Sequence, residues 1–152
     1  KRQDKHLAKF IEIFGARGIA ASETRSPEAS AYAFELSVTV KTDEETVNLR
    51  GTLFNRNDPR ICTVNGMRVD AVPVGNMLVL TNEDKPLIVG RTCTIIGEAG
   101  VNIANLMLGR DAKGGHALTV LNLDQTLSDE LLEKLRAVTH VKEVRLVTLP
   151  EK

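Results

Sequence analysis

Aromatic side chains are scarce in this sequence, and their scarcity narrows the classes of partner. Phenylalanine, tyrosine and tryptophan together make up 3% of the 152 residues, and tryptophan is absent. Proteins that hold single-stranded nucleic acid stack its bases on aromatic rings. The chain also has no excess of positive charge, because 20 basic residues are balanced by 20 acidic ones, and it therefore lacks the field that attracts phosphate backbones. We expect no nucleic-acid partner.

Long apolar runs are missing as well. No segment approaches the roughly 18 consecutive apolar residues of a membrane span. The first residues, Lys1 to His6, lead into an amphipathic pattern and not into the core of a signal peptide. With 42% hydrophobic and 26% charged residues, the composition is typical of a folded protein. We expect a cytoplasmic protein with no membrane partner, and the start at a lysine suggests a fragment.

Cysteine and histidine are too few to indicate a metal centre. Cys62 and Cys93 are the only cysteines, and their apolar neighbours suggest that both are reduced core residues. His6, His116 and His140 have no partners at metal-ligand spacing and are expected at the surface. No nucleophile–base set or phosphate loop is visible either. We therefore expect no metal site and no catalytic residue.

The first half of the chain has the pattern of a helix followed by an antiparallel meander. From Lys5 to Phe14, apolar residues recur at i, i+3, i+4 and i+7, which predicts an amphipathic helix. Strict alternation from Tyr32 to Lys41 predicts a half-buried strand, and the alternation continues in a partner strand from Val47 to Leu53. Asn65-Gly66 is a typical two-residue turn between two short strands.

The second half, after a break at Pro73 to Gly75, combines strands and helices. The predicted elements are a strand Met77–Thr81, a helix Pro86–Ala99, strands Val101–Gly109 and His116–Leu123, a helix capped by Ser128, and a strand Val141–Leu149. This βαββαβ order predicts the ferredoxin-like arrangement, in which both helices cover one face of a four-stranded antiparallel sheet. The expected buried helix faces are Val89, Cys93 and Ile96 in the first helix, and Leu131, Leu135 and Val138 in the second.

These patterns together predict an α+β protein in two domains. Residues 1–73 would form an N-terminal helix on an antiparallel β meander, as a domain whose completeness the sequence leaves open. Residues 76–152 would form the ferredoxin-like βαββαβ domain.

Short polar side chains mark the turns on either side of the predicted helix Pro86–Ala99. Asn82 and Asp84 come before this helix, and Asn102 follows it. The free N–H groups of a helix's first turn can receive the carboxylate of an amino acid. Asp84 can balance the ammonium, and the asparagine amides can donate or accept. The alternative is ordinary structure, since Asp84 is also a typical helix-capping acid and Asn102 a typical turn residue.

Three segments of the second half resemble an ACT domain, the small regulatory module of amino-acid metabolism. They are Asn-Glu-Asp-Lys-Pro at 82–86, Gly-Glu-Ala-Gly-Val-Asn-Ile-Ala at 97–104 and Leu-Gly-Arg-Asp-Ala-Lys-Gly-Gly-His-Ala-Leu at 108–118. Upstream, Arg-Gly-Thr-Leu-Phe at 50–54, Pro-Arg-Ile at 59–61 and the segment 65–73 resemble another domain. It is the intervening (allosteric substrate-binding) domain that precedes ACT in long-form D-3-phosphoglycerate dehydrogenases. The resemblance covers nearly the whole chain.

The resemblance implies a parent enzyme that oxidises 3-phosphoglycerate with NAD at the entry to serine biosynthesis. This chain has no G-x-G-x-x-G motif after a strand, so we expect it to lack the catalytic domains and to hold no cofactor of its own. We interpret it as the regulatory C-terminal portion of such an enzyme, with the missing catalytic domains as partners.

The resemblance also implies an effector site. In the family, positions matching Asn82, Asp84 and Asn102 line an L-serine site between ACT domains of neighbouring subunits. The predicted site for L-serine or another small amino acid consists of Asn82, Asp84, Lys85, Pro86, Leu87, Ile88, Asn102 and Ile103. One position departs from the family, which usually has glycine where this chain has Leu87. A leucine would narrow the site or point into the core, so a ligand-silent dimerisation module is the alternative function.

A second candidate site lies in the first domain. The family's intervening domain has been associated with anion or substrate binding, and Arg50, Arg60 and Arg68 are a possible anion site there. The alternative interpretation is a solvated strand face, where arginines are common.

Association is expected from the sheet itself. In the ferredoxin-like order the second strand lies at a sheet edge, and Val101, Ile103, Leu106 and Leu108 make that strand apolar. An apolar edge favours pairing with another chain. We expect a homodimer through the Val101–Leu108 edge, which would also create the effector cleft. A third interpretation, the related regulatory subunit of iron-sulfur L-serine dehydratases, is disfavoured by the Gly-Thr-Leu-Phe segment.

Overall fold

The chain divides into two compact units, Lys1–Ala31 and Tyr32–Lys152. The computed structural model describes residues 35–54 and 58–150, together with residues 9, 12, 13, 15, 16 and 20. The predicted helix Lys5–Phe14, the first residues of the predicted strand Tyr32–Lys41, and His6 lie wholly or largely outside the described residues. The predicted domain boundary between residues 73 and 76 falls inside the second unit, between its two sheets.

The first sheet is the predicted antiparallel meander. Its strands are β1 (Leu36–Lys41), β2 (Thr46–Phe54), β3 (Asp58–Val64) and β4 (Met67–Ala71), in the order β1-β2-β3-β4. The β3–β4 connection is the predicted two-residue turn, with positive φ angles of 49° at Asn65 and 80° at Gly66. Asparagine and glycine tolerate this conformation, which matches the right-handed twist of the flanking strands.

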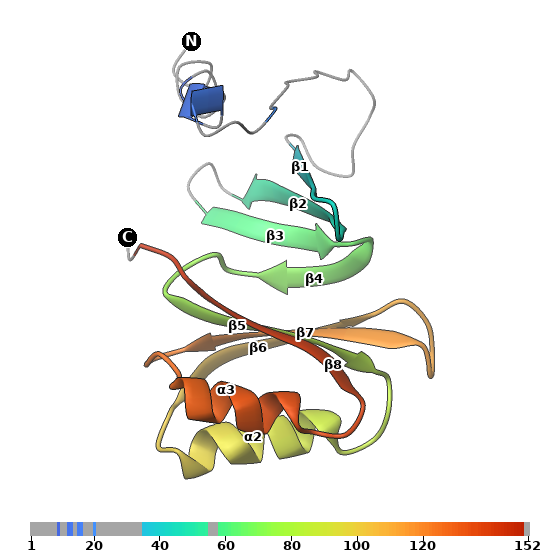
Figure 1. The fold of residues 1–152 in the computed structure, drawn as a ribbon, viewed down its shortest axis with the longest axis vertical. Coiled ribbons are helices and arrows are strands. Elements are labelled where there is room, and N and C mark those ends of the chain that lie inside the picture. Colours follow the sequence, from blue (N-terminus) through green and yellow to red (C-terminus); the bar gives the residue numbers. More distant parts are fainter. Residues whose placement is uncertain are drawn as a thin grey trace. The chain divides into compact units, whose positions relative to one another are not determined.

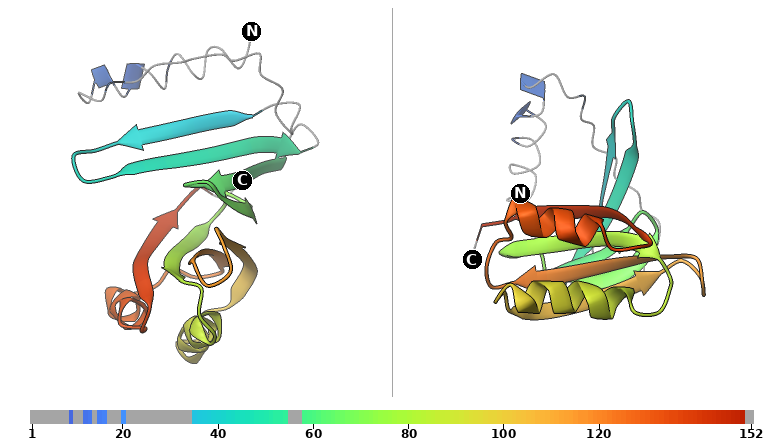
Figure 2. Two further views of the ribbon diagram at one scale, coloured as in Figure 1. Left: turned by 90° about the vertical axis from the view of Figure 1, so that its right-hand side faces the viewer. Right: turned by 60° about the horizontal axis from the view of Figure 1, so that its bottom comes forward.

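The second sheet has the ferredoxin-like strand order that the sequence predicts. Its elements are β5 (Asn76–Glu83), α2 (Ile88–Glu98), β6 (Ile103–Arg110), β7 (His116–Leu123), α3 (Asp129–Arg136) and β8 (Val141–Thr148). The strands are antiparallel in the order β6-β7-β5-β8, so β6 and β8 are the edges. Both helices lie on the same face of this sheet (Figure 2).

The helix-covered face holds the larger hydrophobic core. Alternate residues of the central strands point into it, and Leu78, Leu80 and Leu121 are almost fully buried there. Ile96 of α2 and Leu135 of α3 close the core from the other side. Burying a side chain of this kind contributes about 1.5–3 kcal/mol relative to leaving it exposed, so this layer accounts for much of the stability of the unit.

The opposite face of the same sheet is also covered, by the first sheet (Figure 1). Met77 of β5 and Leu118 and Val120 of β7 form a second core with residues of β3 and β4, namely Ile61, Val64, Met67, Val69 and Ala71. Because β7 has packing on both faces, every residue from Ala117 to Leu123 is buried. The unit therefore has three layers: the β1–β4 sheet, the β5–β8 sheet and the two helices.

Close backbone approach joins β4 to β6 at a glycine. A Cβ atom added to Gly109 of β6 would stand 2.0 Å from the carbonyl oxygen of Arg68 in β4. A side chain at this position would push the two strands apart, so glycine is required here by packing rather than by a turn.

Polar contacts also connect the two sheets. The Nδ2 amide of the buried Asn122 in β7 donates to the carbonyl oxygens of Val72 and Val74, at 3.0 Å each. These two carbonyls belong to the linker between β4 and β5. On β8, Arg145 forms an ion pair with Glu45 of the β1–β2 turn, with an Nη2–Oε1 distance of 2.6 Å. The linker is therefore held by side chains of the β5–β8 sheet.

The first helix of this sheet differs in detail from the prediction. α2 begins at Ile88 and ends at Glu98, instead of running from Pro86 to Ala99. Its buried residues are Ile88, Thr92 and Ile96, so the predicted placement of Val89 on the buried face is wrong. Ile96 is buried as predicted, but the buried row consists of Ile88, Thr92 and Ile96, spaced i, i+4 and i+8 along one face of the helix. Cys93 and Ile95 flank this row and pack partly against the core.

The second helix agrees with the prediction. Ser128 is the N-cap of α3, and its hydroxyl accepts a hydrogen bond from the Leu131 N–H at 3.3 Å. Leu131 and Leu135 are buried in the helix, and Val138 is buried just beyond its end. The two cysteines differ in exposure, since Cys62 is buried and Cys93 is half-buried. Burial raises the pKa of the Cys93 thiol. Both are free thiols.

Candidate functional site

The turn between β5 and α2 holds six of the eight predicted effector residues. At this turn Asp84 is bound to the β6–β7 hairpin. Its Oδ2 atom accepts from the Arg110 Nη1 at 3.0 Å and from the Gly114 N–H at 2.9 Å, and its own N–H donates to the Gly115 carbonyl at 2.8 Å. These donors, first the Gly114 N–H and then the Arg110 guanidinium, lower the pKa of the Asp84 carboxyl group. Asp84 is therefore ionised and held in place.

The helix cap at this turn is unusual. The N-cap of α2 is Leu87, which makes no side-chain capping hydrogen bond, so the alternative that Asp84 caps the helix is wrong. The first N–H groups of α2 consequently have no side-chain acceptor from a cap. Asp84 does not reach them because its carboxylate is turned toward Arg110 and Gly114.

Leu87 itself has a left-handed backbone. Its φ angle is 72° and its side chain is 70% exposed. The left-handed conformation costs an ordinary residue about 1–2 kcal/mol, whereas glycine adopts it freely. The leucine thus points outward. Of the two expectations for it, that it narrows the site or that it points into the core, the second is wrong. The position has a backbone reason to be glycine, independent of any ligand.

Asn82 has a buried polar atom without a partner. Its side chain is on the helix-covered face of β5 and is 2% exposed. The Nδ2 group donates to the neighbouring Glu83 carbonyl at 2.6 Å, but the Oδ1 atom accepts no hydrogen bond among the described residues. The Thr92 hydroxyl of α2, on the same side of the sheet, is equally buried and unpaired. An unpaired buried polar group costs about 1–3 kcal/mol, and a bound donor would remove this cost only by reaching an oxygen that has almost no exposed surface.

The other two predicted residues lie at the opposite end of the sheet. Asn102 precedes β6, and its amide donates to Asp124 Oδ2 at 2.7 Å. Ile103 pairs with Leu123, which pairs in turn with Asn76 at the start of β5, whereas Asn82 is six residues farther along β5. At about 3.4 Å per residue this separation is about 20 Å. Within one chain, Asn102 and Ile103 do not meet the β5–α2 turn.

Glu83 makes contacts beside the turn that the sequence did not predict. Glu83, the last residue of β5, forms ion pairs with Lys142 and His140, at 2.9 Å each. These partners, Lys142 before His140, lower the pKa of Glu83. Sequence reasoning missed both pairs and Arg110, because their partners lie on other strands. His116 is exposed at the start of β7, as expected. Its Nδ1 atom lies 3.2 Å from the Oδ2 atom of Asp111.

A shallow hollow opens beside the turn. Its volume is about 360 Å³, and its lining residues are Lys85, Pro86, Leu87, Ile88, Arg91, Thr139 and His140. Four of them belong to the predicted effector set. Arg91, Thr139 and His140 are additions that only the tertiary structure brings to this place.

The three arginines of the predicted anion site differ in their surroundings. Arg60 is already paired on both sides, with contacts of 3.0 and 3.2 Å to Asp58 and 3.2 Å to Asp70. These carboxylates, Asp58 first, raise its pKa. Arg50 lies 3.7 Å from Glu35, and Arg68 lies on the same row of the sheet, since both are register partners of Thr63. Arg60 therefore has little capacity for a further anion, and the predicted site stays a prediction that rests on Arg50 and Arg68.

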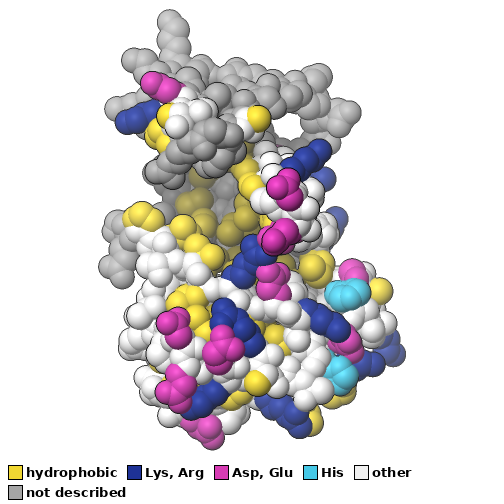
Figure 3. All heavy atoms as spheres, in the orientation of Figure 1, with side chains coloured by type: hydrophobic (Ala, Val, Ile, Leu, Met, Phe, Trp, Pro, Cys, Tyr) yellow, Lys and Arg dark blue, Asp and Glu magenta, His cyan; other side chains and the backbone are white. Residues whose placement is uncertain are grey.

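The surface around these sites carries no field of one sign. On the face shown in Figure 3, basic and acidic side chains are interspersed over the β5–β8 domain. Among the described residues, no group of histidine, cysteine or acidic side chains is arranged to hold a metal ion. Within the same residues, no helix has the length and apolar character needed to cross a bilayer.

Comparisons with known proteins agree with this architecture. Residues 10–65 match the family model for the D-3-phosphoglycerate dehydrogenase intervening domain. The D-3-phosphoglycerate dehydrogenases of Bacillus subtilis and Methanocaldococcus jannaschii are 34% and 32% identical over 134 and 133 residues. Each alignment covers 88% of this chain, but the chain spans only about a quarter of those relatives, 26% and 25% respectively.

One solved structure is similar to about half of this chain. The ACT domain of a GTP pyrophosphokinase from Chlorobium tepidum shares 25% identity, with a TM-score of 0.41, covering 49% of this chain and 97% of that domain. The fold assignment follows from the strand order β6-β7-β5-β8 with both helices on one face. With the family match upstream of it, the chain is identified as the regulatory C-terminal region of the D-3-phosphoglycerate dehydrogenase family, an intervening domain followed by an ACT domain.

Proposed function

We propose that this chain binds L-serine, or a similar small amino acid, between the ACT domains of two copies, and thereby regulates an NAD-dependent D-3-phosphoglycerate dehydrogenase in the cytoplasm. The observation that carries the proposal is the buried, unpaired Oδ1 atom of Asn82 beside the β5–α2 turn. A buried acceptor of this kind gains a hydrogen bond when an ammonium or hydroxyl group arrives. The catalytic domains and NAD belong to the rest of the parent enzyme.

The turn offers complementary groups to an amino acid. The uncapped N–H groups at the start of α2 can receive the carboxylate. Asn82 Oδ1 can accept from the ammonium or from a serine hydroxyl. Asp84 is ionised and supplies negative charge close to the ammonium, although Arg110 and Gly114 already occupy one of its oxygens. Such a set distinguishes a zwitterion from a simple anion.

Two-fold pairing of β6 would bring the two ends of the sheet together. β6 is an edge strand, and Leu108 on it is 51% exposed. Antiparallel pairing of two copies of β6 places the start of one strand, with Asn102, opposite the end of the other, with Arg110. Arg110 is bound to Asp84. Each dimer would thus hold two sites, each made from the turn of one copy and Asn102 of the other.

Regulation would follow from the way the sheets are joined. Asn122 holds the linker to the first sheet, and Arg145 binds the β1–β2 turn. A change in the pairing of the ACT domains would therefore be transmitted to the first sheet and to the part of the protein that precedes it in sequence. Allosteric coupling of this kind typically amounts to about 1–3 kcal/mol.

Calorimetric titration of the chain with L-serine tests the proposal. We expect saturable heat with the wild type and none with Asn82→Ala or with Asn102→Ala. Asn48→Ala, which removes an amide on the first sheet, is the matched control and should bind normally. If the wild type shows no heat at millimolar serine, the effector proposal is wrong.

Mixing two inactive variants tests the shared site separately. Asp84→Ala and Asn102→Ala each damage a different half of every site, so neither should bind alone. A mixed dimer contains one intact site, and an equimolar mixture should therefore recover binding to about a quarter of all sites if the copies exchange at random. No recovery in a mixture that has exchanged subunits would place the site within one chain.

A ligand-silent dimerisation module is the second candidate. The observation in its favour is Leu87, whose exposed side chain lines the hollow beside the turn. Sedimentation would then show a dimer whose mass and stability are unaffected by serine or other amino acids. The relatives that match this chain are dehydrogenases, and they do not favour the serine-dehydratase alternative.

A further inference from the structure

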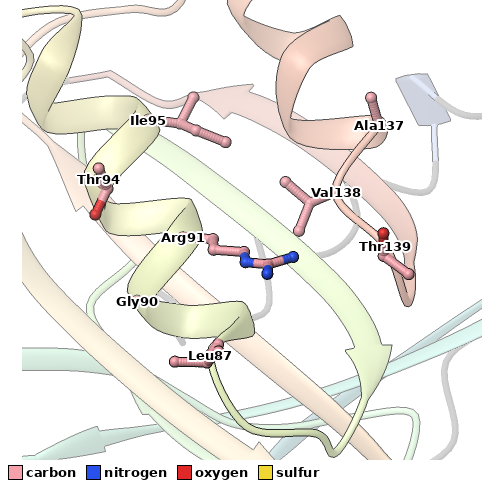
Figure 4. A pocket seen from close by; sticks show the side chains of 8 residues that line it. All are labelled: Leu87, Gly90, Arg91, Thr94, Ile95, Ala137, Val138 and Thr139. Atoms are coloured by element: carbon pink, nitrogen blue, oxygen red, sulfur yellow. The ribbon is translucent and has the colours of Figure 1, made fainter.

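A second hollow lies between the two helices of the ACT domain, away from the predicted effector residues apart from Leu87. We call it the α2–α3 groove; its volume is about 510 Å³. Figure 4 shows its lining: Leu87, Gly90, Arg91, Thr94 and Ile95 from the α2 side, and Ala137, Val138 and Thr139 from the segment after α3. The groove is open to solvent along its length.

Among the residues that the structure describes, Arg91 is the one charged residue that lines this groove. Its guanidinium extends from α2 across the gap toward Val138 and Thr139 (Figure 4). Several other arginines reach a carboxylate oxygen within 3.2 Å, namely Arg60, Arg110, Arg136 and Arg145. No carboxylate among the described residues pairs with Arg91. A guanidinium presents a planar fork of donors that matches a carboxylate, and here that fork faces a groove.

The remaining lining groups suit a short organic body beside the charge. Thr139 brings a hydroxyl from the segment after α3, and Ile95 and Val138 form an apolar wall, whereas the Thr94 hydroxyl points away from the gap (Figure 4). Gly90 keeps the groove open, because a Cβ added there would meet no atom within 4 Å. Glycine inside a helix is about 1 kcal/mol less favourable than alanine, so its presence on this wall is not explained by helix stability.

Among the described residues, no acidic side chain lines the α2–α3 groove, whereas the Arg91 guanidinium does. An ammonium group would therefore find no carboxylate among these lining side chains and would meet the guanidinium instead. This separates the α2–α3 groove from the proposed serine site, where Asp84 and Asn82 favour an ammonium.

We infer that the α2–α3 groove binds a small organic carboxylate that has a short apolar body and no ammonium group. The carboxylate pairs with the Arg91 guanidinium, the Thr139 hydroxyl adds a hydrogen bond, and the apolar body lies against Ile95 and Val138. The inference does not depend on serine binding, since Gly90, Arg91, Thr94 and Thr139 are outside the proposed effector set.

Titration with 3-methylbutanoate, followed by NMR of backbone amides, tests this inference on the full chain. We expect saturable shifts at Gly90, Arg91, Thr94 and Thr139. The neutral analogue 3-methylbutanamide should produce no saturable shift, because it cannot pair with a guanidinium. L-Serine should shift the amides of the β5–α2 turn and leave Thr94 and Ile95 unchanged, since these two residues line only the α2–α3 groove.

Two variants make the test decisive. Arg91→Gln should raise the Kd for 3-methylbutanoate by about tenfold or more, which is the effect expected from losing a hydrogen bond to a charged group. Gly90→Leu should fill the groove and abolish binding without unfolding α2, because open space surrounds Gly90 and leucine is the better helix former. Gly97→Ala, in equally open space on the same helix, is the control and should bind as the wild type does.

Other outcomes would overturn the inference. The absence of saturable shifts in the wild type would remove the site. Unchanged binding in Arg91→Gln, or equal binding of the amide, would remove the carboxylate assignment. Competition by L-serine at Thr94 and Ile95 would contradict the exclusion of an ammonium group, while failure of serine to bind anywhere would affect only the proposed function.

Discussion

The two ends of the β5–β8 sheet are both rich in polar turns, yet they are built differently. At one end, Asp84 is bound by Arg110 and Gly114, and Asn82 leaves a buried oxygen unpaired. At the other end, Asn102 is exposed and its amide is satisfied by Asp124. The first end has unfulfilled hydrogen-bonding capacity inside a rigid turn, whereas the second has a surface amide that is easily redirected.

This difference indicates which half of a shared site would be preformed. A rigid turn with an unpaired acceptor is ready for a ligand before binding, and ligands bind more tightly when groups are held in place in advance. Asn102 would exchange its bond with Asp124 for one with a ligand in another copy. The residues for one site are about 20 Å apart in a single chain, so only association can join them.

The largest effect on dimerisation and serine binding is expected from blocking the β6 edge, whose pairing would join the two ends of the sheet. Leu108→Lys places a positive charge on β6 close to its two-fold equivalent, and like charges at an interface cost several kcal/mol. We expect a dimer that dissociates about a hundredfold more readily and loses its response to serine, as measured by sedimentation and calorimetry. Val147→Lys is the control, since Val147 is 42% exposed on the other edge strand, β8.

A dimer that persists in Leu108→Lys with full serine binding would show that β6 is not the interface. If Val147→Lys has the larger effect, pairing occurs along β8 instead. Either result would break the assignment of the two ends to one shared site.

The next largest effect is on thermal stability. It concerns only the end of the sheet with the β5–α2 turn, and it depends on pH. Because the pKa of Asp84 is lowered in the folded chain, its ionised form stabilises the fold above the ordinary aspartate value of about 3.9. This stabilisation is lost as the pH falls through the lowered pKa. Asp84→Asn should therefore melt at a lower temperature than the wild type at neutral pH, and the difference should shrink as the solution is acidified below pH of about 4.

Thermal melts followed by circular dichroism across this pH range provide the measurement. Asp43→Asn, at an exposed aspartate of the β1–β2 turn, controls for the loss of one negative charge. A difference between Asp84→Asn and wild type that stays constant with pH would mean that the Arg110 and Gly114 contacts do not stabilise the ionised form.

The smallest effect is expected from relieving the backbone at Leu87. Leu87→Gly should stabilise the chain by about 1 kcal/mol, since glycine avoids the cost of the left-handed conformation but loses more entropy on folding. Urea unfolding measures this change. Leu87→Ala removes the side chain and keeps the strained backbone, so it should give no such gain; equal stabilisation by both variants would contradict the backbone explanation.

The same pair of variants sharpens the comparison of function. If the Leu87 side chain narrows the entrance to the rigid end, both Leu87→Gly and Leu87→Ala should raise serine affinity. If only the backbone matters for the ligand, Leu87→Gly alone should do so. Calorimetry distinguishes these outcomes within the proposed function.

Local patterns were sufficient for most of the fold. The strands β1 and β2, the Asn65-Gly66 turn and the Ser128 cap each depend on neighbours within a few residues, and each is present as predicted. The predicted half-burial of the first strand is wrong for its described residues, because Leu36 and Val40 are 47% and 49% exposed. The buried face of α2 was predicted only in part, because Ile96 is buried as predicted but Ile88 and Thr92 are buried instead of Val89. Adjacent apolar residues along this helix leave more than one face possible, and packing against the sheet decides between them.

The site was only partly predictable for a related reason. Asn82, Asp84 and Asn102 are recognisable as polar residues at turns, and their roles were inferred from the family resemblance. The partners of Asp84 lie 26 and 30 residues away on the β6–β7 hairpin, and no sequence period connects them. The contact of Arg60 with Asp70 depends likewise on the register of β3 and β4, whereas its contact with Asp58 is local to β3.

The sequence by itself determined the order of the elements, because alternation, helical periodicity and turn residues act over short distances along the chain. The tertiary structure alone decided which residues meet. It separated Asn102 from Asn82, turned Asp84 away from the helix cap and placed Arg91 opposite Val138 and Thr139. These relations arise from strand order and sheet packing. They bring together side chains that are distant in sequence, and they separate side chains, such as Asn82 and Asn102, that the family resemblance assigns to one site.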